Sequence, residues 1–344
     1  MSGGRVRRAV ALAAMAAVGL SLPAMANEAV DELQDVPTIE VRRDEGWTYA
    51  ALRQAVRSSG RKLDLDAAGF AVVQARRKAM LGVVGRYLKE RFGSADENVL
   101  RAFAEVPREY FHYHYANDES LASVAYEPAA RPWAIGFGSA LSDYLGQAYM
   151  TQLAKVTPDS TVLEIGTGSG YQISVLSRLA RKAYSIEIIE SLGRRTRNLF
   201  KPIGLRNVET RIGDGFYGWP EVEGGFDVIM VTCVAQYVPP ALFEQLKPGG
   251  RLIIPIGQPF KQGQILYVYT KEPDGRISSR RDVGVYFIPM TGKMFTPPPR
   301  PPPAPPATDT VVENVPPPVA PAAPAGGLVP APAGSTPSLP LPRR

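Results

Sequence analysis

The sequence contains very little cysteine and histidine. Cys233 is the single cysteine among 344 residues, and His112 and His114 are the two histidines. One cysteine permits neither an intramolecular disulfide nor a thiolate zinc cluster, and two histidines do not make a His-rich metal site. We therefore expect no bound metal. The net charge of +6 is mild and does not indicate a nucleic-acid-binding protein.

Long apolar runs are also scarce. The run Ala9–Leu20 is too short to cross a bilayer, and no other run is long and apolar enough. It follows the basic stretch Arg5–Arg8 and precedes Ala24–Ala26, a small-x-small cleavage pattern. This arrangement is typical of a signal peptide, so residues 1–26 predict export to the periplasm. The alternative is an ordinary N-terminal helix on a cytoplasmic protein.

Proline is distributed unevenly. Of the 33 prolines, 18 lie between Thr296 and Arg344, where most other residues are Ala, Gly, Val or Leu. Because such a composition cannot form a packed core, we expect residues 296–344 to be a disordered tail. Its proline runs favour extended conformations, which suit a spacer or, alternatively, a ligand for an unknown proline-binding partner.

The rest of the chain divides into an extension and a larger domain. Residues 27–75 are expected to form an N-terminal extension that is partly helical. Apolar residues recur at helical spacing from Thr48 to Phe92, with a break at Ser58–Lys62. Residues 76–295 are expected to form the main domain, which begins with the remaining helical stretch as a cap.

From Asp159 onward, short apolar runs alternate with amphipathic helical stretches. This alternation predicts a doubly wound, Rossmann-like α/β fold with a mainly parallel sheet. The last two runs are joined by the turn Glu272–Gly275, which is too short for a helix, so they should form an antiparallel hairpin at one sheet edge. The expected strands are 161–165, 183–186, 208–212, 226–231, 251–256, 264–270 and 282–288.

A glycine-rich turn follows the first expected strand. Gly166, Gly168 and Gly170 alternate with Thr167 and Ser169, and a helical stretch begins directly afterwards. Glycines let a ligand approach the backbone closely, and the N-terminus of a helix presents free N–H groups. The turn therefore predicts a cofactor site at the carboxyl edge of the sheet.

Acidic residues accompany this turn. Glu187 ends the next strand, 23 residues after Glu164, and is placed to accept hydrogen bonds from ribose hydroxyls. Asp214 and Gly215 follow the third strand, a position that resembles the one where S-adenosylmethionine-dependent methyltransferases place an acid near the adenine. The glycine spacing is G-x-G-x-G and not the dinucleotide spacing G-x-G-x-x-G. With Glu164 before it, the turn resembles the first motif of S-adenosylmethionine-dependent methyltransferases.

Motifs along about two thirds of the chain, in matching order and spacing, resemble the protein-L-isoaspartate O-methyltransferase family. They are Val106–Phe111, Ala125-Tyr126, Val162–Tyr171, Gly213–Gly215, Gly218–Pro220, Phe226-Asp227, Gln245–Leu252 and Phe287–Gly292. The resemblance implies a seven-stranded methyltransferase sheet with an N-terminal helical cap. It also implies methyl transfer from S-adenosyl-L-methionine to isoaspartyl residues of damaged proteins, after which the ester collapses to a succinimide and repair follows.

The family's substrate segment, I-G-x-G-Q-T-I-S-Q-P, corresponds here to Ile135–Tyr144. The resemblance assigns the catalytic serine to Ser142 and substrate contacts to Ser139, Ala140 and Leu141. The segment departs from the pattern at Ser139 and Ala140, and again after Ser142. The residue directly after Ser142 is acidic, and its charge would repel a carboxylate substrate unless this side chain is turned away or paired.

That acid is Asp143, and Arg108 and Arg131 are candidate partners for it. The alternative interpretation of Ser142 is a structural one, in which it is a polar residue that starts the helix 143–154. Two alternatives for the function stay open at this point. One is a different carboxylate substrate, and the other is an exported, non-catalytic binding module with the same fold.

Overall fold

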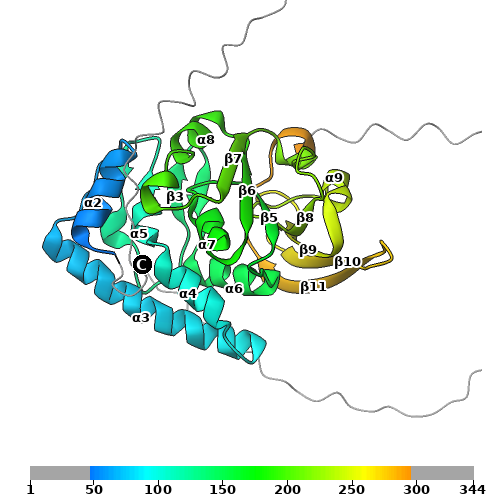
Figure 1. Cartoon of the computed structure of the whole chain (residues 1–344), viewed down its shortest axis with the longest axis horizontal. Helices are drawn as coiled ribbons and strands as arrows, with labels where there is room; N and C mark the ends of the chain where they lie inside the picture. The colour runs from blue at the N-terminus through cyan, green and yellow to red at the C-terminus, as the bar shows by residue number, and fades with distance from the viewer. Residues whose placement is uncertain (1–46, 296–344) are drawn as a thin grey trace, which may run out of the picture. The chain divides into compact units, whose positions relative to one another are not determined.

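The computed structural model describes residues 47–295, and its central element is a seven-stranded sheet (Figure 1). The strand order is β11-β10-β9-β8-β5-β6-β7. The bounds are β5 Thr161–Ile165, β6 Lys182–Glu187, β7 Val208–Ile212, β8 Phe226–Val231, β9 Leu246–Ile256, β10 Gln264–Lys271 and β11 Ile277–Val285. Strands β7, β6, β5, β8 and β9 are parallel, as expected from their alternation with helices.

Both faces of the sheet are covered, which accounts for the near-continuous apolar strands. Successive residues of β5 and β8 enter different cores: Val162 and Met230 belong to one, Leu163 and Val231 to the other. The first core includes residues of α6 (Tyr144–Ala154), α7 (Tyr171–Leu179) and α8 (Glu190–Thr196). The second includes Leu242 of α9 (Pro240–Glu244). The prediction of a doubly wound α/β fold is confirmed.

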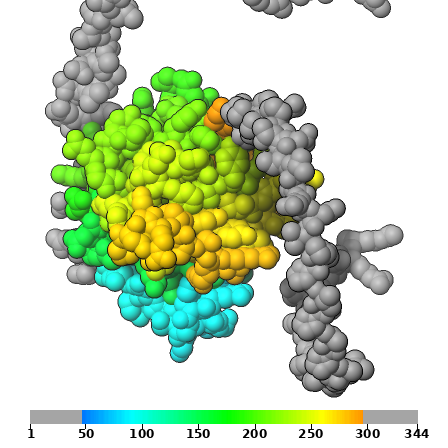
Figure 2. All heavy atoms as spheres, turned by 90° about the vertical axis from the view of Figure 1, so that its right-hand side faces the viewer, coloured from blue at the N-terminus to red at the C-terminus, as the bar shows by residue number. Residues whose placement is uncertain are grey.

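The edge hairpin is also confirmed, although one of its strands lies earlier than expected. Strand β10 pairs antiparallel with β9 and β11. The sequence places the last strand at 282–288, whereas β11 spans Ile277–Val285. Its first five residues are exposed on the sheet edge and include Arg280 and Arg281, so they lack the apolar signal that identifies inner strands. Figure 2 shows the hairpin at the surface.

The helical cap consists of α2 (Tyr49–Ser58), α3 (Ala67–Phe92), α4 (Glu97–Glu105) and α5 (Arg108–Phe111). Side chains of Thr48, Asp66 and Asp96 accept backbone N–H bonds at the starts of α2, α3 and α4. Buried residues of α2 and α3 join the same core as α6 and α7. The expected division after residue 75 falls inside α3, so the extension and the cap share one helix.

Two short hairpins connect the cap to the sheet. They are β1 (Tyr113–His114) with β2 (Glu119–Ser120), and β3 (Trp133–Gly136) with β4 (Ser139–Leu141). Short 3-10 helices lie at Ala122–Val124, Lys201–Ile203, Gly215–Tyr217 (η3) and Gly292–Phe295 (η4). None of the helices within residues 47–295 is long and apolar enough to cross a membrane. The expected leader (1–26) and the expected tail (296–344) lie outside the described residues.

Candidate active site

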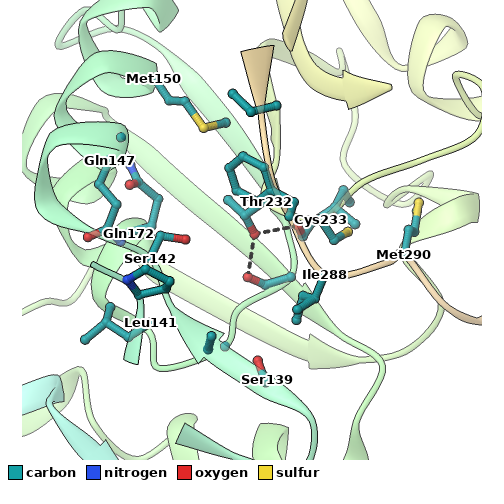
Figure 3. A pocket seen from close by; sticks show the side chains of 18 of the residues that line it. Ser139, Leu141, Ser142, Gln147, Met150, Gln172, Thr232, Cys233, Ile288 and Met290 are labelled. Atoms are coloured by element: carbon teal, nitrogen blue, oxygen red, sulfur yellow. Dashed lines mark hydrogen bonds between the residues drawn. The ribbon is translucent and has the colours of Figure 1, made fainter. Parts of the chain in front are cut away.

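A cavity of about 950 Å³ lies at the carboxyl ends of β5, β6 and β8. Its walls come from the segments that follow these strands, from the β3–β4 hairpin, from α6 and from the segment after β11. In Figure 3, Ser142, Gln147 and Gln172 lie on one side of the cavity, and Thr232, Cys233 and Ile288 face them from the other. The volume is within the range that holds a nucleoside-sized ligand.

The glycine turn after β5 has a backbone that only glycine adopts easily. Gly166, Gly168 and Gly170 have φ values of 102°, 53° and 85°. A Cβ at Gly166 would lie 2.7 Å from Oγ1 of Thr232, whose single hydroxyl hydrogen is shared between the carbonyl oxygens of Ile165 and Gly166, each 2.9 Å from Oγ1. The turn is therefore clamped between β5 and β8, with its backbone open to the cavity.

Glu164 lies at the base of the cavity and carries an unpartnered oxygen. Its Oε2 accepts a hydrogen bond from the Ser185 hydroxyl at 2.7 Å, and Ser185 Oγ lies 2.7 Å from Thr167 Oγ1. Its Oε1 is buried without a hydrogen-bond partner among the described residues. Burial raises the pKa of Glu164 well above its ordinary value, and the nearby Glu187 adds to this.

Glu187 and Asp214 use their carboxylates to shape the cavity wall. Glu187 accepts backbone N–H bonds from Gly168 at 2.8 Å and from Ile189 at 2.9 Å. Its pKa is raised by burial, and these N–H bonds oppose the rise. Asp214 accepts N–H bonds from Phe216 at 2.9 Å and from Lys293 at 2.7 Å, which ties η3 to η4. Each carboxylate oxygen accepts one bond and retains a second lone pair for a ligand.

Ser142 lies between β4 and α6 and lines the cavity. Its hydroxyl makes no hydrogen bond to another residue of the described chain, so it is free to bind a ligand. The residue that caps α6 is Asp143, whose Oδ1 accepts a hydrogen bond from Gly146 N at 2.8 Å. The reading of Ser142 as the residue that starts the helix is therefore wrong, because its neighbour has that role.

Neither arginine suggested as a partner of Asp143 forms an ion pair with it within residues 47–295. Arg131 pairs with Glu127 at 3.3 Å and stacks over the Trp133 ring. Arg108, 2 % exposed, donates to the Ser142 carbonyl oxygen at 2.7 Å and to Gln147 Oε1 at 2.6 Å. It thus holds the backbone of the Ser142 loop and the first turns of α6.

The cap reaches the site through the residue next to Arg108. Glu109 accepts hydrogen bonds from Tyr126 at 2.6 Å and from Gln74 of α3 at 2.7 Å. Tyr126 in turn accepts a bond from the backbone N–H of Arg108 at 2.8 Å. Within the motif Val106–Phe111, Glu109 therefore fixes α3 and the neighbouring Arg108 fixes the Ser142 loop.

The structure brings together all but one of the residues predicted for the site. Gly170 does not line the cavity; it caps α7 in a left-handed conformation, and a Cβ at its position would lie 3.2 Å from the ring of Phe200 and 3.5 Å from that of Phe111. The predicted residues that line the cavity are Ser139, Ala140, Leu141, Ser142, Glu164, Gly166, Thr167, Gly168, Ser169, Glu187, Asp214 and Gly215.

The sequence analysis missed several lining residues, among them Gln147, Gln172, Thr232 and Met290. Thr232 directly follows β8, and the rule that ligands bind beyond the carboxyl ends of parallel strands would have found it. Gln147 and Gln172 lie in the first turn of α6 and α7, and no local pattern distinguishes them from ordinary helix residues. No group of His, Cys, Asp and Glu in residues 47–295 could hold a metal ion.

The comparisons with known proteins agree on one family. The sequence model of the family "Protein-L-isoaspartate(D-aspartate) O-methyltransferase (PCMT)" matches residues 83–295. A protein-L-isoaspartate O-methyltransferase 1 of Nitrosospira multiformis is 40% identical over 246 residues, which cover 72% of this chain and 98% of the relative. A relative with such a name from Syntrophobacter fumaroxidans is 44% identical over 209 residues, 60% of this chain and 81% of the relative.

Solved structures show the same fold. One protein-L-isoaspartate O-methyltransferase superposes with a TM-score of 0.55 at 27% identity, over 63% of this chain and 67% of the other. A Plasmodium falciparum protein with this family name has a TM-score of 0.50 at 23% identity, over 61% of this chain and 97% of the other. That structure is a complex with S-adenosyl-L-homocysteine.

Proposed function

Because this chain belongs to the protein-L-isoaspartate(D-aspartate) O-methyltransferase family, we propose that it methylates the free carboxylate of isoaspartyl residues in proteins with S-adenosyl-L-methionine. The observation that carries the proposal is that the Gly166–Ser169 turn lines the same cavity as the free hydroxyl of Ser142, which is labelled in Figure 3. The alternatives of another carboxylate substrate and of a non-catalytic module have no observation in their favour.

The residues of the cavity fit the cofactor. S-adenosylmethionine supplies, when bound, a methyl group on a positively charged sulfur, and it also carries a charged amino group. The buried, unpartnered Oε1 of Glu164 offers an acceptor for a cationic donor. Gly166 and Gly168 leave room for close approach, and Glu187 and Asp214 offer lone pairs to ribose and adenine.

The methyl transfer needs orientation more than acid or base catalysis. An isoaspartyl carboxylate is already ionised near pH 7, so no base has to activate it. One of its oxygens bonds to the methyl carbon while the carbon–sulfur bond breaks and the electron pair stays on sulfur. In this proposal Ser142 donates a hydrogen bond to the other oxygen and aligns the attack, while Ser139 to Leu141 hold the adjoining backbone.

The charge of the cavity lining affects how the cofactor and the substrate come together. Among the described residues, the lining contains four acids and neither lysine nor arginine; the acids are Asp143, Glu164, Glu187 and Asp214. Acids favour a cationic cofactor and disfavour a free carboxylate substrate. A substrate carboxylate would therefore find its attractive charge in the cofactor, which places the reacting groups together.

We also propose, from the sequence, that the chain is exported by the leader 1–26 and that the tail 296–344 serves as a spacer or binds a partner. Export would separate the enzyme from cofactor made in the cytoplasm. Fractionation of cells into periplasm and cytoplasm, followed by N-terminal sequencing, tests this part separately. A mature protein that begins at Asn27 supports it, and an intact cytoplasmic protein contradicts it.

The test of the function is methyl transfer by the full chain to an isoaspartyl peptide, with the matching aspartyl peptide as the control. We expect transfer to the isoaspartyl form alone. The variant Ser142→Ala should lose about tenfold to a thousandfold in kcat, as for one lost donor at a reacting oxyanion, and should still bind cofactor. Ser278→Ala, an exposed serine of β11 outside the cavity lining, is the matched control. Transfer to neither peptide would reject the proposal.

A further inference from the structure

Three aromatic side chains at the cavity are exposed to solvent. Phe137, Phe260 and Tyr286 all line it and are 38%, 71% and 63% exposed. They come from three separate places in the chain: the β3–β4 turn, the β9–β10 loop and the residue after β11. We call these three residues the aromatic rim. Large exposed apolar groups beside a cavity often mark a binding surface.

Two rim residues also have a backbone conformation that is unfavourable for phenylalanine. Within residues 47–295, five residues other than glycine have positive φ, and Phe137 (55°) and Phe260 (57°) are two of them. For a bulky side chain this is an unusual conformation with an energetic cost. Strain of this kind concentrates at functional sites.

The turns themselves would favour other residues at both positions. Phe137-Gly138 is the two-residue loop between β3 and β4, and both residues have positive φ, a pattern that favours Asn-Gly. The turn Gln258–Lys261 is closed by a hydrogen bond from Lys261 N to Gln258 O at 3.3 Å, and Phe260 is its third residue. After a proline, positive φ at the third residue of a turn favours glycine or asparagine.

Exposure and strain therefore disfavour the same two phenylalanines in the free protein, and neither is explained by the fold. A partner that covers their rings would account for both. The rim residues carry no charge, and the charged lining residues within the described range 47–295 are all acidic. The occupant that fits is an uncharged, apolar one that accompanies the substrate carboxylate into the cavity.

We propose that the aromatic rim binds apolar side chains on either side of the isoaspartyl residue in an extended polypeptide. The inference rests on the proposed function and defines its substrate class: isoaspartyl sites within apolar sequence, which a folded protein buries and an unfolded one exposes. Phe137 and Phe260 are thus specificity-determining residues, while Ser142 and the glycine turn bind the reacting groups.

The experiment compares two isoaspartyl peptides whose flanking residues are uncharged. One has leucines and the other has serines beside the isoaspartyl residue. For the full-length protein we expect a KM about tenfold lower for the leucine peptide, since one well-buried apolar side chain supplies about this factor. In Phe137→Asn and Phe260→Asn this preference should fall to within about twofold. Equal KM values for both peptides, or variants that keep the preference, would overturn the inference.

Thermal unfolding tests the strain independently of activity. Because asparagine tolerates positive φ, Phe137→Asn and Phe260→Asn should raise the melting temperature by about 1–3 °C. Lys155→Asn is the matched control: Lys155 has φ of 52° but does not line the cavity, so its variant should gain stability and keep the peptide preference. A lower melting temperature for both phenylalanine variants would show that these side chains stabilise the free protein and would overturn the inference.

The two proposals fail in different ways. If the isoaspartyl function is wrong, neither peptide is methylated, and the rim is then tested by the fluorescence anisotropy of both peptides with S-adenosylhomocysteine present. If only the rim inference is wrong, both peptides are methylated with equal KM. A leucine preference in binding that Phe137→Asn removes would support the rim even without turnover.

Discussion

Arg108 donates a hydrogen bond of 2.7 Å to the carbonyl oxygen of Ser142 from a completely buried position. The same guanidinium holds Gln147 Oε1 and lies over the Tyr171 ring, 5.2 Å from its centroid. The planar guanidinium presents several donors in a fixed fork, so it donates to both acceptors while its face lies over the ring. The catalytic candidate is therefore positioned through its backbone by a residue of the cap.

We expect Arg108→Met to impair turnover more than cofactor binding. The change leaves two buried acceptors without a donor, which costs about 2–4 kcal/mol of folding stability. The freed Ser142 loop should lower kcat about tenfold to a hundredfold, while cofactor affinity changes less than about threefold because the side chain of Arg108 donates to Ser142 and Gln147 and not to the glycine turn. Urea unfolding, calorimetric cofactor titration and methyl-transfer kinetics measure the three quantities. Arg108→Lys keeps the charge but not the planar fork, so its losses should lie between those of Arg108→Met and none; equal losses in kcat and cofactor affinity would contradict a positioning role.

Asp143→Asn should improve the use of a carboxylate substrate. Asparagine caps helices as well as aspartate does, so α6 keeps its hydrogen bond to Gly146 N. The change removes a negative charge from the cavity lining, and we expect KM for an isoaspartyl peptide to fall about two- to fivefold at low salt, with a smaller effect at high salt. Asp143→Ala should show the same gain in KM but lose about 1 kcal/mol of stability with the cap. An unchanged KM in both variants would mean that the carboxylate of Asp143 does not act on the substrate.

Gly166→Ala should weaken both the fold and cofactor binding. A Cβ at this position would approach Thr232 Oγ1 to 2.7 Å in addition to the cost of a φ of 102°. We expect a loss of about 2–3 kcal/mol in urea unfolding and a fall of tenfold or more in cofactor affinity. Gly224→Ala, at a φ of 76° with open space around it, is the control for strain alone. It should lose about 1–2 kcal/mol and keep full affinity.

The buried carboxyl of Glu164 predicts that cofactor binding releases a proton. Its pKa is raised in the folded protein, so between the ordinary value and the raised value the folded state holds a proton that the unfolded state has lost. The stability of the ligand-free protein should therefore decrease as pH rises through this window. A cationic ligand beside Glu164 lowers this pKa, so that the proton leaves and affinity increases with pH.

Calorimetric titrations in buffers of different ionisation enthalpy measure this proton directly. We expect a release of up to about one proton per cofactor bound at pH values between the ordinary and the raised pKa of Glu164. Glu164→Gln keeps the shape of the side chain but cannot titrate, and it should abolish both the release and the pH dependence of affinity. Proton release that persists in Glu164→Gln would assign it to another group, with Glu187, whose pKa is also raised, as the first to test.

The parts of the fold that follow from local pattern could be predicted from the sequence. The inner strands are short runs of apolar residues that are buried, and the residue types of the turn at Gly166–Gly170 are sufficient to predict a ligand site. The first five residues of β11 could not be assigned to a strand from the sequence, because these exposed residues take their conformation from pairing with β10 and not from burial.

The site was predictable to the extent that its residues follow strand ends. The role of Asp143 could not be read from the sequence, since the choice between capping α6 and pairing with an arginine depends on rotamer and loop path. The contact between Arg108 and Ser142 joins residues 34 positions apart and depends on how the cap docks on the sheet. Gly170 shares the motif but does not line the cavity, and a Cβ at its position would lie 3.2 Å from the Phe200 ring.

The acidic lining of the cavity also has a consequence for how a catalytic cycle ends. Before transfer, the attraction between a cationic sulfonium and an anionic carboxylate would draw the two reactants together over Asp143, Glu164, Glu187 and Asp214. Transfer converts them into a neutral thioether and a neutral ester. Since no lysine or arginine among the described lining residues replaces the lost attraction, the products would have no electrostatic reason to remain as a pair. Because the transfer neutralises both charges in a single step, it would favour release of the ester at the end of each turnover.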